Sequence, residues 1–152
     1  MTQPALDDAV IMKLIDVARL AWGSAMVYKS KIAWGASVVT QKNSYFGGCN
    51  IDGIISDEGI CAERAAINHA VVHGHYHFKG LCLFGKEMGF PCGRCLQYAL
   101  IFCQVNNQDL PIVMAQEDGR YQISTIKQLL PQGYETRVYG DQLRSYQDKP
   151  IA

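Results

Sequence analysis

Residues 61–64 read Cys-Ala-Glu-Arg and residues 91–95 read Pro-Cys-Gly-Arg-Cys, and the fold can be worked out from these two stretches. Each begins a predicted helix after a glycine-containing turn. A thiol at a helix start lies beside free backbone N–H groups, which favour thiolate over thiol. If the two helix starts lie side by side, Cys61, Cys92 and Cys95 can hold one tetrahedral zinc ion and leave its fourth position open to water. Three protein ligands and an open position are typical of catalytic rather than structural zinc.

Charged residues lie next to these cysteines. Arg64 and Arg94 are expected to offset, from outside the ligand set, the negative charge that three thiolates leave on a dication. Glu63, two residues after Cys61, can reach the open position without binding the metal. A carboxylate there can take a proton from water and deliver it to a leaving group. On its own, Glu63 would be interpreted as a first-turn acid that complements the helix dipole.

Composition predicts a globular protein with one domain, residues 1–152. The chain is 49% hydrophobic and 18% charged, which is enough apolar material for a core. Because 14 Lys+Arg balance 14 Asp+Glu, no nucleic-acid partner is expected. No apolar run reaches the roughly 18–20 residues of a membrane span, so no membrane partner is expected either.

The first eight residues carry two acids and no base, unlike a secretory signal, and we expect a cytoplasmic protein. In a reducing compartment, six cysteines point to metal binding or catalysis more than to disulfides.

Hydrophobic periodicity predicts alternating helices and strands. Helices are predicted over 6–22, 61–73, 92–105 and 125–130, and strands over 33–40, 44–50, 80–85, 111–115 and 121–123. Strands that alternate with helices after an opening hairpin favour a mixed sheet with helices on both faces. The polar tail from residue 134 either docks on this body or frays.

The succession Cys-Ala-Glu and Pro-Cys-x-x-Cys resembles the cytidine deaminase superfamily. Residues 48–52, Gly-Cys-Asn-Ile-Asp, precede Cys61 at the distance of that family's ribose-binding strand, Gly-Cys-Asn-x-Glu. The resemblance spans roughly residues 35–131. At position 61 this sequence has cysteine rather than histidine, and in this respect it resembles the members that act on free nucleosides. The resemblance implies an α/β fold, a three-layer α/β/α sandwich with a mixed five-stranded sheet.

The same resemblance implies zinc-dependent hydrolysis of a free cytosine nucleoside. Cytidine or 2′-deoxycytidine would yield uridine or 2′-deoxyuridine plus ammonia, as in pyrimidine salvage. One Zn²⁺ per chain would be held by the three cysteines, and Glu63 would protonate N3 and then the departing amine. Asn50 would bind a ribose hydroxyl, with Asp52 at the position of the family's Glu. Members form compact homotetramers in which a neighbouring subunit helps to close each site.

Three departures from the family pattern concern the substrate. Asp52 is one methylene shorter than the Glu it replaces. Ile32 stands where the family places an aromatic residue that faces the base. After Leu129-Leu130-Pro131, the aromatic continuation is replaced by Gln132-Gly133-Tyr134.

Two details are more similar to blasticidin-S deaminase, which acts on a cytosine nucleoside antibiotic: Gln97 after Pro-Cys-Gly-Arg-Cys, and Leu-Leu-Pro-x-Gly-Tyr over 129–134. A modified cytosine nucleoside is therefore an alternative substrate.

Other interpretations use the same residues differently. The cysteines could form a structural zinc site with Cys49 or His69 as a fourth ligand, in a non-catalytic domain used for assembly. Glu63 argues against this, because a structural site needs no proton shuttle. A second metal could bind His69 and His73, spaced i, i+4, with further histidines up to residue 77.

Overall fold

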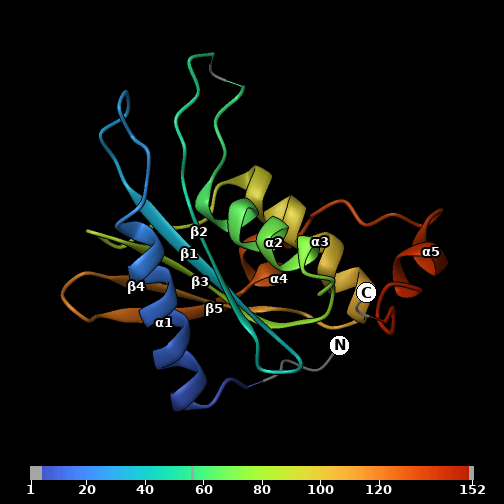
Figure 1. Ribbon diagram of the computed structural model, residues 1–152. Helices are drawn as coiled ribbons and strands as arrows, with labels where there is room; N and C mark the ends of the chain where they lie inside the picture. Colours follow the sequence, from blue (N-terminus) through green and yellow to red (C-terminus); the bar gives the residue numbers. More distant parts are fainter. Residues whose placement is uncertain (1–4, 56, 151–152) are drawn as a thin grey trace.

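The computed structural model describes residues 5–55 and 57–150, in which five strands form one sheet (Figure 1). The strands are β1 (Trp34–Thr40), β2 (Tyr45–Cys49), β3 (Phe78–Gly85), β4 (Pro111–Gln116) and β5 (Tyr121–Thr125). Their order is β2-β1-β3-β4-β5. β3 and β4 are parallel, and the other neighbours are antiparallel. The prediction of a mixed five-stranded sheet is confirmed.

Helices cover both faces of the sheet (Figure 1). α1 (Asp8–Trp22) packs on one face, and α2 (Ala62–Val72) and α3 (Gly93–Asn106) pack on the other. Side chains of β4 alternate between the two cores, with Ile112 under α2 and α3 and Val113 under α1. This alternation produces the predicted three layers. The short helices α4 (Ile126–Leu129) and α5 (Gly140–Arg144) follow the last strand.

Local capping sets the helix ends within a residue or two of the predicted bounds. α1 begins at Asp8 because the Asp7 side chain accepts a hydrogen bond from the backbone N–H of Val10. α2 is followed by Gly74, whose φ of 81° suits glycine. Among the described helices, none is long and apolar enough to cross a membrane.

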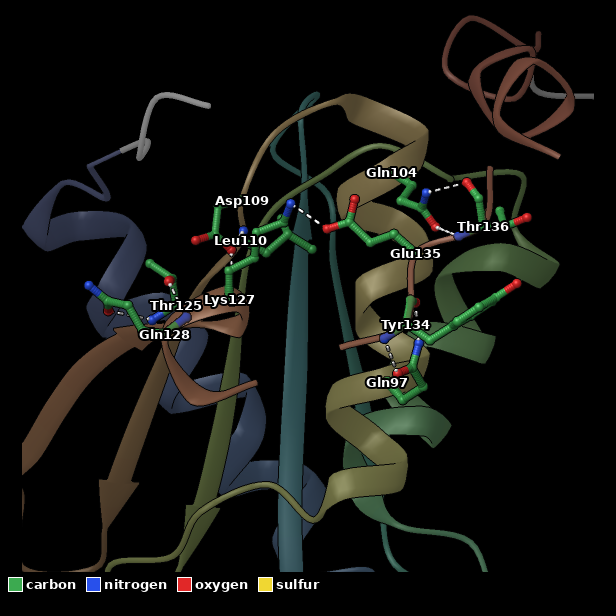
Figure 2. Close-up of polar contacts among 10 residues, drawn as sticks. All are labelled: Gln97, Gln104, Asp109, Leu110, Thr125, Lys127, Gln128, Tyr134, Glu135 and Thr136. Carbon is green, nitrogen blue, oxygen red and sulfur yellow. Dashed lines mark hydrogen bonds and ion pairs between the residues drawn. The ribbon is translucent and has the colours of Figure 1, made fainter. Parts of the chain in front are cut away.

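The polar tail docks on α3 through two glutamine side chains (Figure 2). The Gln97 amide donates to the carbonyl oxygen of Tyr134 and accepts from its N–H. Gln104, seven residues later on α3, makes the same pair of bonds with Thr136. An ion pair between Lys127 and Glu135 also holds this segment. The sequence had left open whether the tail docks or frays, and here it docks.

A close backbone contact places α2 against β2. A Cβ atom on Gly48 would lie 2.2 Å from the nitrogen of Ala66 and 2.7 Å from the carbonyl oxygen of Ala62. The strand can therefore approach the helix this closely only without a side chain at Gly48. This contact helps to fix where the first turn of α2 lies.

We expect Gly48→Ala to lower the free energy of unfolding by about 1–3 kcal/mol, because backbone atoms of α2 cannot move aside as a flexible side chain could. Urea denaturation at 25 °C measures the change. Gly23→Ala is the matched control, since Gly23 has helical φ and its added Cβ would meet its nearest atom at 3.5 Å. Equal destabilisation by the two substitutions would contradict this interpretation.

Candidate active site

The three cysteine sulfurs meet where two helices begin. Cys61 is the N-cap of α2, Cys92 is the N-cap of α3, and Cys95 lies in the first turn of α3. Neither N-cap side chain bonds the helix backbone, so the first N–H groups stay available beside the sulfurs. The three sulfur atoms lie within 4.8 Å of one another, with Cys61 and Cys92 3.8 Å apart.

This arrangement has the size of a zinc site. Zn–S bonds of about 2.3 Å at tetrahedral angles put two sulfurs about 3.8 Å apart. Within the described ranges, no further histidine, cysteine, aspartate or glutamate joins this group. The donor set therefore fits zinc held by three protein ligands, and neither Cys49 nor His69 supplies a fourth.

The histidines lie at the opposite end of α2. His69 Nδ1 is 2.9 Å from the carbonyl oxygen of Gly47, and His73 Nδ1 is 2.8 Å from that of His69. In the part of the chain that the structure describes, they do not form a cluster of three ligand atoms. The structure therefore gives the hypothesis of a second metal no support.

Arginine and hydrogen bonding control the charge of the sulfur cluster. Arg64 Nη2 lies 4.0 Å from the sulfur of Cys61. A hydrogen bond with Cys95, helped by Arg64 and opposed by burial, lowers the pKa of Cys61 to about 5. The same bond and burial raise the pKa of Cys95. Arg94 lines the same cavity from an exposed position.

Glu63 is buried beside the cluster, in the first turn of α2, and is only 6% exposed. Burial, together with the charge on Cys61, raises the pKa of Glu63 to about 7. A carboxyl group with a pKa near neutrality is suited to both accepting and donating a proton. The side chain lines the same cavity as the sulfurs.

That cavity has a volume of about 480 Å³, which suits a small molecule. Its lining includes Trp34, Asn50, Asp52, Cys61, Glu63, Arg64, Leu83, Phe90, Cys92 and Arg94. Seven of the eight residues singled out from the sequence therefore line this cavity. The eighth, Cys95, is buried, and its sulfur lies in the cluster with those of Cys61 and Cys92. Sequence reasoning missed Trp34 and Phe90 as lining residues, although the position of Phe90 directly before the Pro-Cys-x-x-Cys motif was a usable signal.

Asn50 and Asp52 line the cavity and also hold its walls. The Asn50 amide accepts from the N–H of Trp34 at 2.8 Å and donates to the carbonyl oxygen of Ile32 at 2.9 Å. Asp52 accepts from the N–H groups of Lys29 and Ser30 and from the Ser30 hydroxyl, and these bonds lower its pKa. Their contacts with a sugar remain a prediction.

Comparison with known proteins places this geometry in a family. A model of the cytidine and deoxycytidylate deaminase zinc-binding region matches residues 9–107. The chain belongs to this family. Its relatives include a cytidine deaminase from Sporosarcina psychrophila, 32% identical over 123 residues, which are 80% of this chain and 88% of that protein. A cytidine deaminase from Mycoplasma genitalium is 28% identical over 101 residues, or 64% and 75% of the two chains.

Solved structures of deaminases share the fold. The cytidine deaminase from Burkholderia pseudomallei superposes with a TM-score of 0.75 at 27% identity, covering 81% of this chain and 98% of that one. The enzyme from Mycobacterium tuberculosis gives 0.69 at 22% identity, covering 86% and 100%. These likenesses confirm the predicted α/β/α sandwich.

We expect Asn50→Ala to lower the free energy of unfolding by about 1–3 kcal/mol, because two hydrogen bonds to the backbone before and within β1 are lost. Asn50→Asp keeps the oxygen that accepts from the N–H of Trp34, so it should lower the free energy of unfolding by about half as much. Chemical denaturation measures both. An Asn50→Ala protein of unchanged stability would show that the amide does not hold this wall.

Proposed function

We propose that this protein is a zinc-dependent aminohydrolase that converts cytidine or 2′-deoxycytidine to the uridine nucleoside and ammonia. The observation that carries the proposal is that buried Glu63 lines the same cavity as Cys61 and Cys92, whose sulfurs form a cluster with that of Cys95. A structural zinc site needs the sulfurs but not the carboxyl group. The names of the relatives support the substrate, since those proteins are cytidine deaminases.

Cys61, Cys92 and Cys95 would hold one Zn²⁺ per chain. When bound, zinc supplies the Lewis acidity that lets water attack near neutral pH, lowering the pKa of the water to about 7. Arg64, close to the Cys61 sulfur, offsets part of the negative charge of the thiolates, and Arg94 adds to the positive potential at the mouth. Both arginines thus tune the site without binding the ion.

Glu63 would move two protons during the reaction. It takes one from the attacking water and gives it to ring N3 while the water oxygen adds to C4. It then passes the proton of the new C4 hydroxyl group to the exocyclic amine. The C4–N4 bond breaks, ammonia leaves, and the uracil ring remains.

The sugar would lie toward Asn50 and Asp52, on the side of the cavity formed by the loops after α1 and β2. These loops lie side by side, since Met26 pairs with Ile51 and Asp52 bonds the turn at Ser30. The alternative of a blasticidin-like substrate gains little from Gln97, because its amide is engaged by the backbone of Tyr134.

We further infer that residues 1–152 act as one deaminase domain in the cytoplasm, as a homotetramer. Large apolar side chains on the loops around the cavity are exposed and suit contact with a second copy. They are Tyr28, Ile32, Ile51, Ile54, Ile55 and Phe90.

Glu63→Gln should lower kcat for cytidine by at least about 100-fold, because the amide cannot shuttle protons. Ammonia release by zinc-loaded wild type and variant measures the loss, and zinc content should stay equal in the two. If the variant turned over cytidine at the wild-type rate, the assigned role of Glu63 would be wrong.

Cys95→Ser should bind zinc less tightly than wild type, with the purified variant holding well below one ion per chain after dialysis against a chelator, because one of three sulfur ligands is lost. Elemental analysis against protein concentration measures the ratio. Cys103→Ser is the matched control, a buried cysteine of the same helix that lies outside the cluster. Equal zinc content in both variants would contradict the ligand set.

A further inference from the structure

We propose that Trp34 is the wall that limits the size of the pyrimidine base in this site, so that cytosines with a bulky C5 substituent are excluded. The inference rests on the proposed function for the identity of the substrate. The position of the indole rests on the structure alone.

Two glycines leave the space that the Trp34 indole occupies. Trp34 begins β1 and pairs with Gly85 of β3. A Cβ atom on Gly85 would lie 2.3 Å from Cζ3 of the indole, and one on Gly89 would lie 2.2 Å from Cη2. Neither glycine has positive φ, so it is the ring and not the backbone conformation that requires them. The six-membered ring is therefore held in a recess that larger residues would fill.

The backbone of Trp34 is fixed as firmly as its ring. Its N–H donates to the Asn50 side chain at 2.8 Å, and its carbonyl oxygen accepts from the Asn50 N–H at 3.3 Å. Asn50 therefore holds both sides of the peptide from which the indole projects. Because the Trp34 backbone is held by hydrogen bonds and its ring packs closely against two glycines, the indole forms a rigid wall.

Trp34 separates two cavities of similar size. The cavity with the sulfur cluster has about 480 Å³, and a neighbouring one has about 490 Å³. Trp34 is the one described residue that lines both. The neighbouring cavity is lined also by Trp22, Lys31, Ile32, Ala33, Lys86, Glu87, Met88 and Gly89. Ile32, at the position where the family has an aromatic residue, lines that second cavity and not the first.

The chemistry decides which part of a substrate the wall restricts. C4, N3 and the amine must reach Glu63 and the sulfur cluster, and N1 carries the sugar. Of the two remaining C–H carbons, C6 lies next to N1 and its sugar, whereas C5 lies next to C4 and is the one that a wall near the sulfur cluster would restrict. With Trp34 in place, the flat apolar ring offers the base a contact surface and leaves little room beyond it. A small residue would join the two cavities and admit the substituent.

The first test uses the two tryptophans of the chain. Trp22→Phe leaves Trp34 as the single tryptophan, and Trp34→Phe leaves Trp22, which packs on Phe84. Uridine, the product nucleoside, should quench the fluorescence of Trp22→Phe by at least twice as much as that of Trp34→Phe. Equal quenching, or none in Trp22→Phe while calorimetry shows uridine bound, would overturn the proposal.

The second test measures size selectivity as the ratio of kcat/KM for 5-iodocytidine to that for cytidine. The ratio should rise about tenfold or more from wild type to Trp34→Ala, the order of effect that a change of pocket size gives, and by less in Trp34→Phe. An unchanged ratio in folded, zinc-loaded variants would overturn the proposal. If Trp34→Ala does not fold, Trp34→Phe and the quenching experiment decide. Wild type that binds uridine but leaves cytidine unreacted would instead refute the proposed function.

Discussion

Three sulfur atoms within 4.8 Å of one another, carried by the starts of two helices, constrain the rest of this molecule. Cys61 begins α2, and Cys92 and Cys95 begin α3, so both helices must cover the same face of the sheet with their first turns adjacent. Helix starts supply N–H groups that favour thiolate, and Arg64 supplies a full positive charge at the cluster. Glu63 follows Cys61 by two residues, so the geometry that gathers the sulfurs also buries the carboxyl group beside them.

Close backbone contacts are what allow this arrangement. Gly48 lets β2 approach the first turns of α2 to a distance that a Cβ atom would prevent. Gly85 and Gly89 do the same for the indole of Trp34 at the end of β3 and in the loop that leads to α3. At these glycines the missing side chain gives room to a functional element: a helix start in one case and a cavity wall in the other.

Local features were predictable from the sequence. The helices and strands follow from periodicity, and the sulfur cluster follows from three cysteines at two helix starts. Long-range contacts were not predictable. The tail docks because the Gln97 side chain hydrogen-bonds the backbone of Tyr134, 37 residues away. Nothing in the local pattern of α3 predicts that the Gln97 side chain binds a distant backbone. The helix α5 was not predicted at all, since its five residues carry no apolar stripe.

Asn50 and Asp52 illustrate the same limit within the site. Their place near the cavity was foreseen from a short motif. Their hydrogen bonds run to Trp34 and Ser30, 16 and 22 residues away, and only the folded chain shows that these polar groups hold its walls. A motif can thus predict where a residue lies without predicting which hydrogen bonds it makes.

X-ray absorption at the zinc edge of the metal-loaded protein tests the central claim most directly. The account predicts three sulfur neighbours at about 2.3 Å and one lighter neighbour at about 2.0–2.1 Å, as expected for three cysteines and an open position. Four sulfur neighbours would contradict it, because the site would then be closed to water. Two sulfurs with imidazole scattering would also contradict it, because the ion would then be bound by histidine.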